Sequence, residues 1–406
     1  MSTERTILHC DLNNFFASVS LLYNQTLLRE PVAVGGSVEN RHGIILAKNE
    51  MAKKYGVKTA EPIWKAKQKC AGLYILPPLY DKYEEFSERA REIYHRYTDM
   101  VEPFGMDECW LDVTASRLLF GDGVQIAEKI KRDIKNELGI TASVGVSFNK
   151  IFAKLGSDMK KPDGLTVISR ENFKEKIYSL PVSEMLFVGK STAQTLSSRG
   201  VFTIEDATLC DENMLKRVLG KNGLALRQCA LGNDNSPVCT PKSSDRPKSI
   251  GMSRTLSRDL ESEEEVWREL LFYGEELGER LRSYGMYATG VVMTVRNKDL
   301  TTKEFSAKIE SGTQTGITLA REGMRLFRDY GELPCRNVGL RATRLRDGKG
   351  GVQRDMFSEA ETEDKMLRIE ESLSSICLKF GENAVTRGTL LGRKKTFSPG
   401  FSLPSR

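Results

Sequence analysis

Two acidic residues, Asp107 and Glu108, lie side by side in the otherwise apolar stretch "GMDECWLDV", residues 105–113. On a regular strand, neighbouring side chains point to opposite faces of the sheet. One acid would therefore enter a core, where an unpaired charge is costly. A strand end or hairpin tip, with a cation between the carboxylates, explains the pair better. Asp11, at the end of the strand-like run "TILHCD", supplies a third carboxylate.

Three carboxylates at strand ends could hold Mg²⁺, which prefers oxygen ligands and is usually completed by substrate phosphates. Two such ions about 3.5–4 Å apart can hold the attacking and leaving oxygens of a phosphoryl transfer. Lysines that could bind phosphates follow as the pairs Lys53–Lys54 and Lys160–Lys161. From spacing alone, ordinary capping or solvation of the acids and a solvated lysine face remain open alternatives.

The elements that must position these residues begin with a sheet. Strand and helix patterns alternate over the first ~170 residues, which indicates an α+β or α/β core with the acid pair in a turn between two strands. Residues 171–235 are predicted to be helical with glycine-punctuated turns. Residues 236–249, rich in Pro, Ser and Lys, are predicted to be a linker.

A second alternating region covers residues 250–346 and predicts a small α+β domain with roughly four strands and two helices. Residues 358–392 have a helical pattern to which the sequence assigns no function. The final stretch, "KKTFSPGFSLPSR", is typical of a disordered tail.

Composition narrows the class of protein. Of 406 residues, 39% are hydrophobic and 29% charged, as expected for a soluble chain of about two to four domains. No apolar run approaches the ~20 residues that span a membrane, and "MSTERTILHCD" has no signal-peptide pattern, so we expect a cytoplasmic protein without a membrane partner. The net charge of +6 favours polyanionic partners.

The number and spacing of the cysteines and histidines argue against a zinc site or another metal site built from sulfur or histidine ligands. Eight cysteines are spread along the chain without a CxxC pair, which indicates reduced thiols rather than disulfides or a zinc site. With only three histidines, a divalent metal should have oxygen ligands.

Five segments, in order and spacing, resemble the successive motifs of the Y-family, or translesion, DNA polymerases over residues 6 to about 346. The segments are "CDLNNFFASV", "LAKNEMAKKYGVKTAEPIWKAK", "FGMDECWLDVT", "TASVGVSFNKIFAKLGSDMKKPDGLTVI" and "LPVSEMLFVGKSTAQTLSSRGVFTIEDA". The "NE" before the basic stretch and the tail resemble the bacterial polymerase V catalytic-subunit and UV-damage-repair branch more than the polymerase IV branch.

The resemblance implies an α+β right-hand polymerase. Its expected parts are a palm (1–24 and 79–170), fingers (25–78), a helix-hairpin-helix thumb (171–235), the linker (236–249), a little finger (250–346) and a tail with a clamp-binding motif (347–406).

The resemblance also implies a catalytic site with two Mg²⁺ ions. Asp11, Asp107 and Glu108 match the family's metal ligands, and the backbone carbonyl of Leu12 matches a further ligand position. Three departures, none of them at a metal ligand, are Glu50 for a common tyrosine, Asn13 for a frequent acid and Gly105 for a frequent serine.

Substrate selection follows from the same motifs. Phe16 matches the aromatic steric gate, whose ring excludes the 2′-OH of a ribonucleotide; a core phenylalanine is the alternative. Phe15 is expected to be structural or to contact the dNTP triphosphate through its backbone. Lys53 and Lys161 match residues that bind the triphosphate.

DNA contacts are expected in the thumb and the little finger. The "FVGK" turn, with Gly189 and Lys190, resembles a helix-hairpin-helix that presents backbone N–H groups to a phosphate, and Gly220 to Gly223 resembles a partner hairpin. Helix C-caps are the alternative for each turn. Five arginines on or beside little-finger strands could bind phosphates: Arg254, Arg336, Arg341, Arg344 and Arg346. The acidic stretch at 261–265 is expected to face solvent.

A short peptide after the little finger, "QRDMF" at 353–357, resembles the bacterial sliding-clamp-binding motif through Gln353, Met356 and Phe357. The expected partners are therefore primer-template DNA, dNTPs and the sliding clamp, with the chain itself a monomer.

The prediction is a template-directed, low-fidelity DNA polymerase without a 3′→5′ exonuclease. Two rivals remain. A nucleotidyl cyclase also uses a carboxylate-bearing palm, but has no need of a thumb and a basic last domain. A non-catalytic DNA-binding scaffold would keep those parts and could lose its acids, all three of which are present here.

Overall fold

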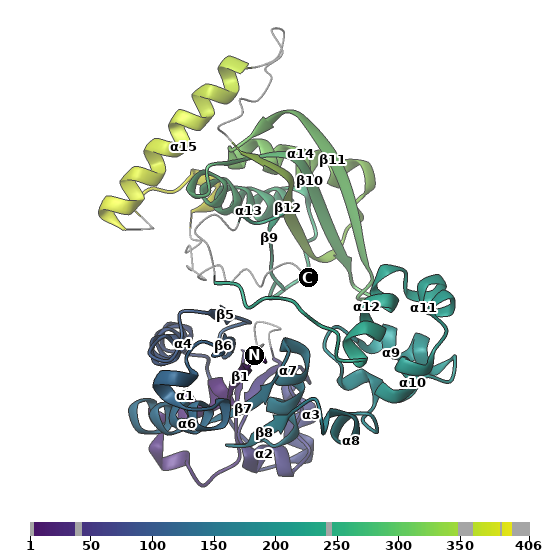
Figure 1. Cartoon of the computed structure of the whole chain (residues 1–406). Coiled ribbons are helices and arrows are strands. Elements are labelled where there is room, and N and C mark those ends of the chain that lie inside the picture. Colours follow the sequence, from purple (N-terminus) through teal and green to yellow (C-terminus); the bar gives the residue numbers. More distant parts are fainter. Residues whose placement is uncertain (1–3, 37–42, 241–245, 348–359, 382–383, 392–406) are drawn as a thin grey trace. The chain divides into compact units, whose positions relative to one another are not determined.

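A computed structural model describes residues 4–36, 43–240, 246–347, 360–381 and 384–391 (Figure 1). Residues 1–36 and 43–243 form one compact unit, and the remainder forms a second. The boundary falls inside the predicted linker. None of the helices in these ranges is both long and apolar enough to cross a membrane.

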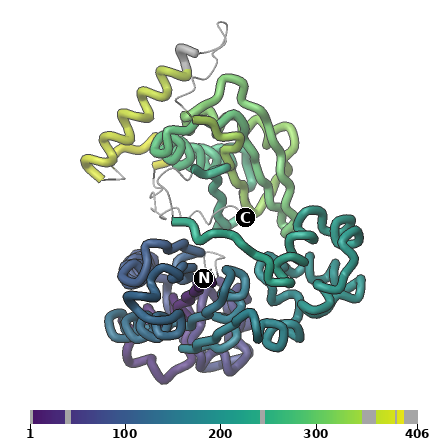
Figure 2. Tube along the Cα trace, in the orientation of Figure 1, coloured from purple at the N-terminus to yellow at the C-terminus, as the bar shows by residue number. Residues whose placement is uncertain are grey.

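The core of the first unit is a five-stranded sheet in the order β5-β6-β1-β7-β8. Strand β1 (Ile7–Leu12) pairs antiparallel with β6 (Glu108–Asp112) on one side and β7 (Ala142–Ser147) on the other, although these segments are far apart in the sequence (Figure 2). Strands β5 (Val101–Pro103) and β8 (Leu165–Ile168) complete the edges. All of β1 is buried, so the sheet is covered on both faces.

The side-chain alternation of β1 separates these faces. Leu8, Cys10 and Leu12 pack in the cluster formed with α1 (Phe15–Leu22), α4 (Tyr80–His95) and α6 (Gly123–Leu138). Ile7, His9 and Asp11 point to the opposite face, as the period of two requires. Ile7 packs there against Ala153 of α7 (Lys150–Met159). Helix α7 therefore packs on the face that carries Asp11, where Val238 is also buried beside Ile7.

Helix α7 lies unusually close to the sheet because β7 has a glycine beneath it. A Cβ atom on Gly145 would lie 1.9 Å from the carbonyl oxygen of Ala153 and 2.6 Å from the backbone nitrogen of Ser157. The Asn149 side chain caps the helix by accepting a hydrogen bond from the N–H of Phe152 at 2.8 Å. These features fix where the polar side chains of α7 meet β1.

A small three-stranded sheet in the order β3-β2-β4 forms most of the region predicted as fingers. It consists of β2 (Val32–Gly35), β3 (Ile45–Lys48) and β4 (Tyr74–Leu76), with helices α2 (Glu50–Lys54) and α3 (Ile63–Lys69). The Asn49 side chain caps α2 at Ala52 and accepts a hydrogen bond from the N–H of Val32, which ties the helix to the sheet.

The predicted helical character of residues 171–235 is confirmed. The helices are α8 (Phe173–Ile177), α9 (Lys190–Ser197), α10 (Ile204–Leu209), α11 (Glu212–Leu219) and α12 (Lys221–Ala230). The beginning of the predicted linker then packs on the first unit. Val238 is buried beside Ile7 and Trp110, and the backbone N–H of Cys239 donates to Glu102 at 2.7 Å.

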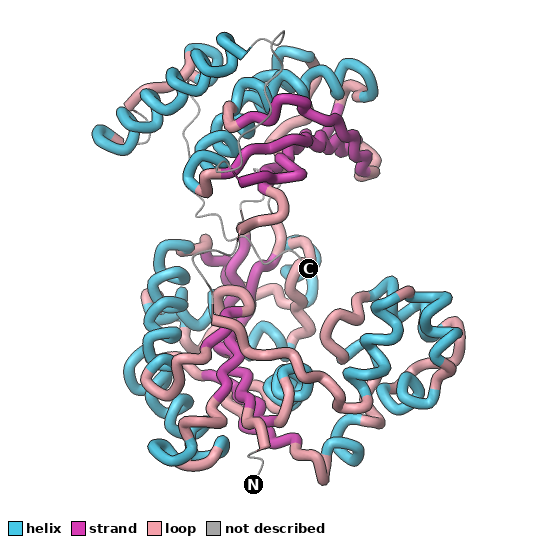
Figure 3. Tube along the Cα trace, turned by 45° about the horizontal axis from the view of Figure 1, so that its top comes forward, coloured by secondary structure: helices cyan, strands magenta, loops and turns pink. Residues whose placement is uncertain are grey.

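The second unit contains an antiparallel four-stranded sheet in the order β11-β10-β12-β9 (Figure 3). Its strands are β9 (Ile250–Ser253), β10 (Met286–Asn297), β11 (Thr302–Thr313) and β12 (Cys335–Asp347), and its helices α13 (Glu263–Ser283) and α14 (Gly316–Tyr330) pack on one face. This agrees with the predicted four strands and two helices.

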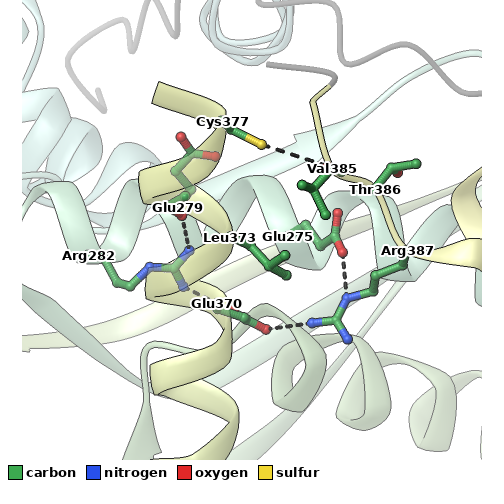
Figure 4. Close-up of a pocket in the computed structure, with 10 residues that line it drawn as sticks. Glu275, Glu279, Arg282, Glu370, Leu373, Cys377, Val385, Thr386 and Arg387 are labelled. Carbon is green, nitrogen blue, oxygen red and sulfur yellow. Dashed lines mark hydrogen bonds and ion pairs between the residues drawn. The ribbon is translucent and has the colours of Figure 1, made fainter. Parts of the chain in front are cut away.

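A further helix, α15 (Ala360–Phe380), confirms the helical pattern predicted within 358–392. Its Glu370 is buried and accepts hydrogen bonds from the backbone N–H groups of Gly316 (2.9 Å) and Ile317 (3.1 Å), at the start of α14. Arg282 (2.8 Å) and Arg387 (3.3 Å) pair with the same carboxylate (Figure 4). Helix α15 is therefore anchored by a buried charge at a helix N-terminus. The predicted disordered end of the tail lies outside the described residues.

Candidate active site

The three predicted metal ligands lie together at one end of the first sheet. Asp11 and Glu108 are direct register partners on β1 and β6. Asp107 lies in the turn between β5 and β6, as predicted, and its carbonyl oxygen accepts a hydrogen bond from the N–H of Leu12 at 3.0 Å. Gly105 in this turn has φ +97, which favours glycine and accounts for its presence where the family often has serine.

Two lysines contact these carboxylates. Lys161 Nζ lies 2.6 Å from Asp11 Oδ2, and Lys154 Nζ lies 2.9 Å from Glu108 Oε2 and 3.3 Å from Asp11 Oδ2. Both lysines also pair with Asp158. Lys161 was predicted to lie near the site. Lys154 was missed because a lysine in an amphipathic helix usually faces solvent, and no local pattern marks this one as a partner of the carboxylates.

Burial and mutual repulsion raise two of the three acidic pKa values. Burial raises the pKa of Asp107 to about 7, and the charges of Asp11 and Glu108 add to the rise. Burial also raises the pKa of Asp11, against the opposing charges of Lys161 and Lys154. Burial works to raise the pKa of Glu108 as well, but His9 and Lys154 outweigh it and lower that pKa to about 2. The site therefore needs positive charge to hold three carboxylates.

The donor set fits a magnesium site. Its ligands would be carboxylate oxygens, which Mg²⁺ prefers, and Glu108 Oε2 is buried without a well-directed hydrogen bond from any described residue. Within the described ranges, no three acidic, histidine or cysteine side chains are already arranged so that they could hold a metal ion. Lys154 and Lys161 supply the positive charge beside the carboxylates instead.

Asn13 has a structural role that explains its place in the motif. Its buried side-chain oxygen accepts hydrogen bonds from the N–H of Asp163 (2.7 Å) and the hydroxyl of Thr141 (3.0 Å), and its amide donates to Ser143 Oγ (2.9 Å). A carboxylate could accept these bonds but could not donate the third. Asn13 thus fastens the turn that carries Lys161 to the end of β1.

The predicted gate residue differs from its neighbour in burial. Phe15 is buried in the core, whereas Phe16 is only half-buried. The Phe16 ring stacks on Tyr83, with centroids 4.1 Å apart and an interplanar angle of 9°, and lies edge-on to Tyr80. The alternative that Phe16 is simple core filler therefore fits Phe15 better.

Lys53 is not brought to the carboxylates among the described contacts. It lies on α2, half-exposed, with Nζ 3.6 Å from Glu50 Oε1. The same Glu50 oxygen accepts a hydrogen bond from Asn14 Nδ2 at 3.1 Å, which links α2 to the start of α1. Glu50, which replaces the usual tyrosine, therefore connects the predicted fingers to the palm.

The "FVGK" turn is open. Gly189 is the N-cap of α9, with φ −77, so the C-cap alternative is wrong for this glycine; apart from its chain neighbours, no described residue has an atom within 4 Å of where its Cβ would be. Gly220, with φ +62, joins α11 to α12. A Cβ on Gly223 would lie 2.4 Å from the carbonyl oxygen of Leu215, so Gly223 serves helix packing.

The five arginines predicted to bind DNA differ in their exposure and in the groups that they contact. Val338, Leu340 and Ala342 of β12 face the helices, so Arg341 points to the other face, where it pairs with Glu304 at 3.0 Å. Arg344 and Arg346 are exposed near the end of the same strand, and Arg336 is half-buried near its start. Arg254 instead lies 5.6 Å from the ring of Phe272 on α13. Gln353, Met356 and Phe357 lie outside the described residues.

A palm-like sheet that gathers three carboxylates and two lysines at one end is typical of enzymes that transfer phosphoryl or nucleotidyl groups. Family models described as "impB/mucB/samB family" and "impB/mucB/samB family C-terminal domain" match residues 10–158 and 247–356. The chain belongs to this family, the Y family of translesion DNA polymerases.

Curated relatives cover nearly the whole chain. DNA polymerase IV of Acetivibrio thermocellus is 46% identical over 390 residues, covering 96% of this chain and 98% of the relative. DNA polymerase IV 1 of Bacillus subtilis is 34% identical over 405 residues, covering 98% and 96%. A solved Y-family DNA polymerase chimera of Dbh and Dpo4 has a TM-score of 0.75 at 25% identity, covering 84% of this chain and 99% of the chimera.

These relatives correct one detail of the sequence analysis. They are named DNA polymerase IV, so they do not support the predicted closeness to the polymerase V branch. The prediction depended partly on the "NE" pair, and Asn49 and Glu50 make local capping and bridging contacts in the fingers region. Such a short pattern does not separate the branches.

Proposed function

We propose that this chain adds dNTPs to a primer 3′ end under the direction of a template, as a DNA polymerase specialised for synthesis past damaged bases. The observation that carries the proposal is the meeting of Asp11, Asp107 and Glu108 with Lys154 and Lys161 at one end of the sheet. The likeness to polymerase IV proteins over 96% of the chain supports it.

The carboxylates of Asp11, Asp107 and Glu108 and the carbonyl of Leu12 would hold two Mg²⁺ ions. When bound, such ions activate the primer hydroxyl and support the departing pyrophosphate. Lys161 would exchange its contact with Asp11 for the dNTP triphosphate, and Lys53 would contact the triphosphate from the fingers. Positioning and electrostatics would supply most of the rate enhancement.

Phe16 would act as the steric gate. Its half-buried ring, supported by Tyr83, presents a rigid surface that could exclude the 2′-OH of a ribonucleotide. Phe15, which is buried, would contribute only through its backbone or by supporting the gate.

The remaining parts would hold DNA and partners. The proposed parts are a palm (1–24, 79–170), fingers (25–78), a thumb (171–235), a linker (236–249), a little finger (250–346) and a tail (347–406). The open turn at Gly189 and Lys190 and the arginines on β12 would bind DNA phosphates. Residues 353–357 would bind the sliding clamp. We place the protein in the cytoplasm as a monomer.

The testing experiment is primer extension with Mg²⁺ and single dNTPs on undamaged and abasic templates. The wild-type protein should extend both primers, and the Asp107→Ala/Glu108→Ala variant should extend neither while still binding primer-template DNA. A wild-type protein that binds DNA but incorporates no nucleotide would favour the scaffold alternative. Cyclic nucleotide formation from NTPs without DNA would favour the cyclase.

A further inference from the structure

His9 lies beside the candidate metal ligands but is neither a proposed metal ligand nor a proposed contact of the dNTP or the DNA. Its side chain is wholly buried on β1, two residues before Asp11 and therefore on the same face of the sheet. The ring is held on two sides: Nδ1 lies 2.8 Å from Ser157 Oγ on α7, and the ring lies edge-on to Trp110 with centroids 5.2 Å apart. This imidazole has a fixed orientation.

The other ring nitrogen faces Glu108. His9 Nε2 lies 3.3 Å from Glu108 Oε2, and each of these buried atoms lacks a hydrogen bond of good geometry to any other described residue. An unsatisfied buried polar atom costs about 1–3 kcal/mol, so His9 Nε2 is best explained as a partner of Glu108 Oε2, an oxygen that Lys154 Nζ also contacts at 2.9 Å.

We propose that His9 is a positioning residue for the polymerase reaction, whose Nε2–H orients the Glu108 carboxylate for metal binding. The inference rests on the proposed role of Glu108 as a metal ligand. In the required tautomer, Nδ1 accepts a hydrogen bond from Ser157 Oγ. That hydroxyl also lies 2.7 Å from the carbonyl oxygen of Lys154, so its proton turns from that carbonyl to the ring. Residues that orient a ligand in this way affect metal affinity as well as rate.

Lys154 cannot substitute for His9 in this role. Its Nζ contacts the same Glu108 oxygen at 2.9 Å, but it also contacts Asp11 and Asp158. A cation bound by Glu108 would repel the ammonium group, whereas a neutral N–H donor can stay beside the carboxylate when a metal binds. His9 touches only Glu108 among the three acids, so its loss should alter one ligand and leave the others in place.

Two substitutions separate positioning from packing. The amide of His9→Gln can place a donor near the former Nε2 position, whereas His9→Leu fills the space without a donor. We expect His9→Leu to weaken Mn²⁺ binding and to lower kcat by about 10- to 100-fold. His9→Gln should recover most of both losses. Glu108→Gln serves as the reference for a damaged ligand.

The measurement is Mn²⁺ binding to the full-length protein in the presence of a dideoxy-terminated primer-template and a dNTP. Electron paramagnetic resonance detects the free Mn²⁺ and so gives the amount bound. The Mg²⁺ dependence of kcat and thermal melting accompany it. Weaker binding in His9→Leu with recovery in His9→Gln supports the proposal. Wild-type Mn²⁺ affinity in His9→Leu, or losses in both variants that simply follow their melting temperatures, would overturn it.

If Glu108 is not a metal ligand, the experiment gives a different result from the one expected when only the role of His9 is wrong. Unchanged Mn²⁺ affinity in Glu108→Gln would show that Glu108 is not a ligand, and the role of His9 would fall with it. If Glu108→Gln has reduced Mn²⁺ affinity while His9→Leu has wild-type affinity, Glu108 remains a ligand and only the positioning role of His9 is rejected. If His9→Leu does not fold, Ser157→Ala provides the same test. A loss of Mn²⁺ affinity smaller than that expected for His9→Leu would support the proposal, and an unchanged Mn²⁺ affinity would overturn it.

Discussion

The ring of Phe16 lies flat against the ring of Tyr83, with centroids 4.1 Å apart. Tyr83 is itself buried, and its hydroxyl shares a hydrogen bond of 2.6 Å with Ser20 Oγ. The candidate gate is therefore held by an aromatic ring that is fixed at its far end. Selection against ribonucleotides should depend on both rings.

Phe16→Ala should admit rNTPs, with discrimination between dNTP and rNTP falling by roughly tenfold or more because the excluding ring is gone. Steady-state single-nucleotide incorporation measures the change. Tyr83→Phe keeps the ring and loses only the hydroxyl, so it should retain nearly all discrimination. Unchanged discrimination in Phe16→Ala would contradict the gate assignment.

Replacing Asp11 by Asn should abolish incorporation, with a fall in kcat of about a thousandfold or more, since metal ions supply several kcal/mol of transition-state stabilisation. Removing divalent metal with EDTA should have the same effect on the wild-type protein, reversed by adding Mg²⁺. Primer-template affinity provides the control and should change little. Residual activity near the wild-type level would exclude Asp11 as a ligand.

Lys160 and Lys161 are adjacent but differ in environment, which provides a matched pair. Both residues are exposed, but Lys161 Nζ contacts Asp11 at 2.6 Å, whereas Lys160 forms no ion pair with any acid of the described residues. Lys161→Ala should raise the KM for dNTP by about tenfold through loss of a charge-assisted contact with the triphosphate, and Lys160→Ala should leave KM nearly unchanged. Equal effects of the two substitutions would show that only general positive charge matters here.

The face of β12 opposite helices α13 and α14 should contribute to DNA affinity through phosphate contacts. Combined replacement of Arg341, Arg344 and Arg346 by Ala should weaken duplex binding and reduce the salt slope by about one for each lost contact. Fluorescence anisotropy at several salt concentrations measures both quantities. Arg321→Ala, on the helix α14 that packs on the other face, is the control. A salt slope that matches the wild type would disprove the contacts.

Removing the Glu370 carboxylate should loosen helix α15 from the second unit. Glu370→Ala leaves two N–H groups at the start of α14 without their acceptor and removes one ion pair from each of Arg282 and Arg387, at a cost of about 2–4 kcal/mol in the free energy of unfolding. Faster hydrogen exchange at Gly316 and Ile317 and a lower melting temperature should report it. The exposed neighbour Glu371→Ala should behave as the wild type.

Much of the fold and the candidate site could be predicted because the informative residues mark strand ends. Asp11 closes an apolar strand, and Asp107 and Glu108 interrupt another, so local pattern alone places them at turns. The α+β character, the helical region after residue 171 and the strands of the second unit follow from the same alternation of patterns.

The contacts missed by the sequence analysis are those made across long separations. Lys154 lies in an amphipathic helix, where a lysine usually faces solvent, and only the close approach of α7 over Gly145 brings it to Asp11 and Glu108. The capping of α14 by Glu370 likewise joins elements with no shared local pattern. Periodicity gives the face of a helix but not the partner that meets it.

The register of β1 against β6 limits which insertions and deletions the gene can accept during evolution. Side chains alternate along β6, so Glu108 shares a face with Trp110, while Cys109 lies in the opposite core. Gaining or losing one residue in the turn before Glu108 would send an acid into that core and a thiol towards Asp11. Point substitutions can accumulate singly at turn positions other than Gly105 and the candidate ligand Asp107, whereas a change in the length of the turn would shift the register of the strand that follows. Lineages of this polymerase should therefore keep the length of the turn, together with Gly105 and Asp107, and vary its other residues.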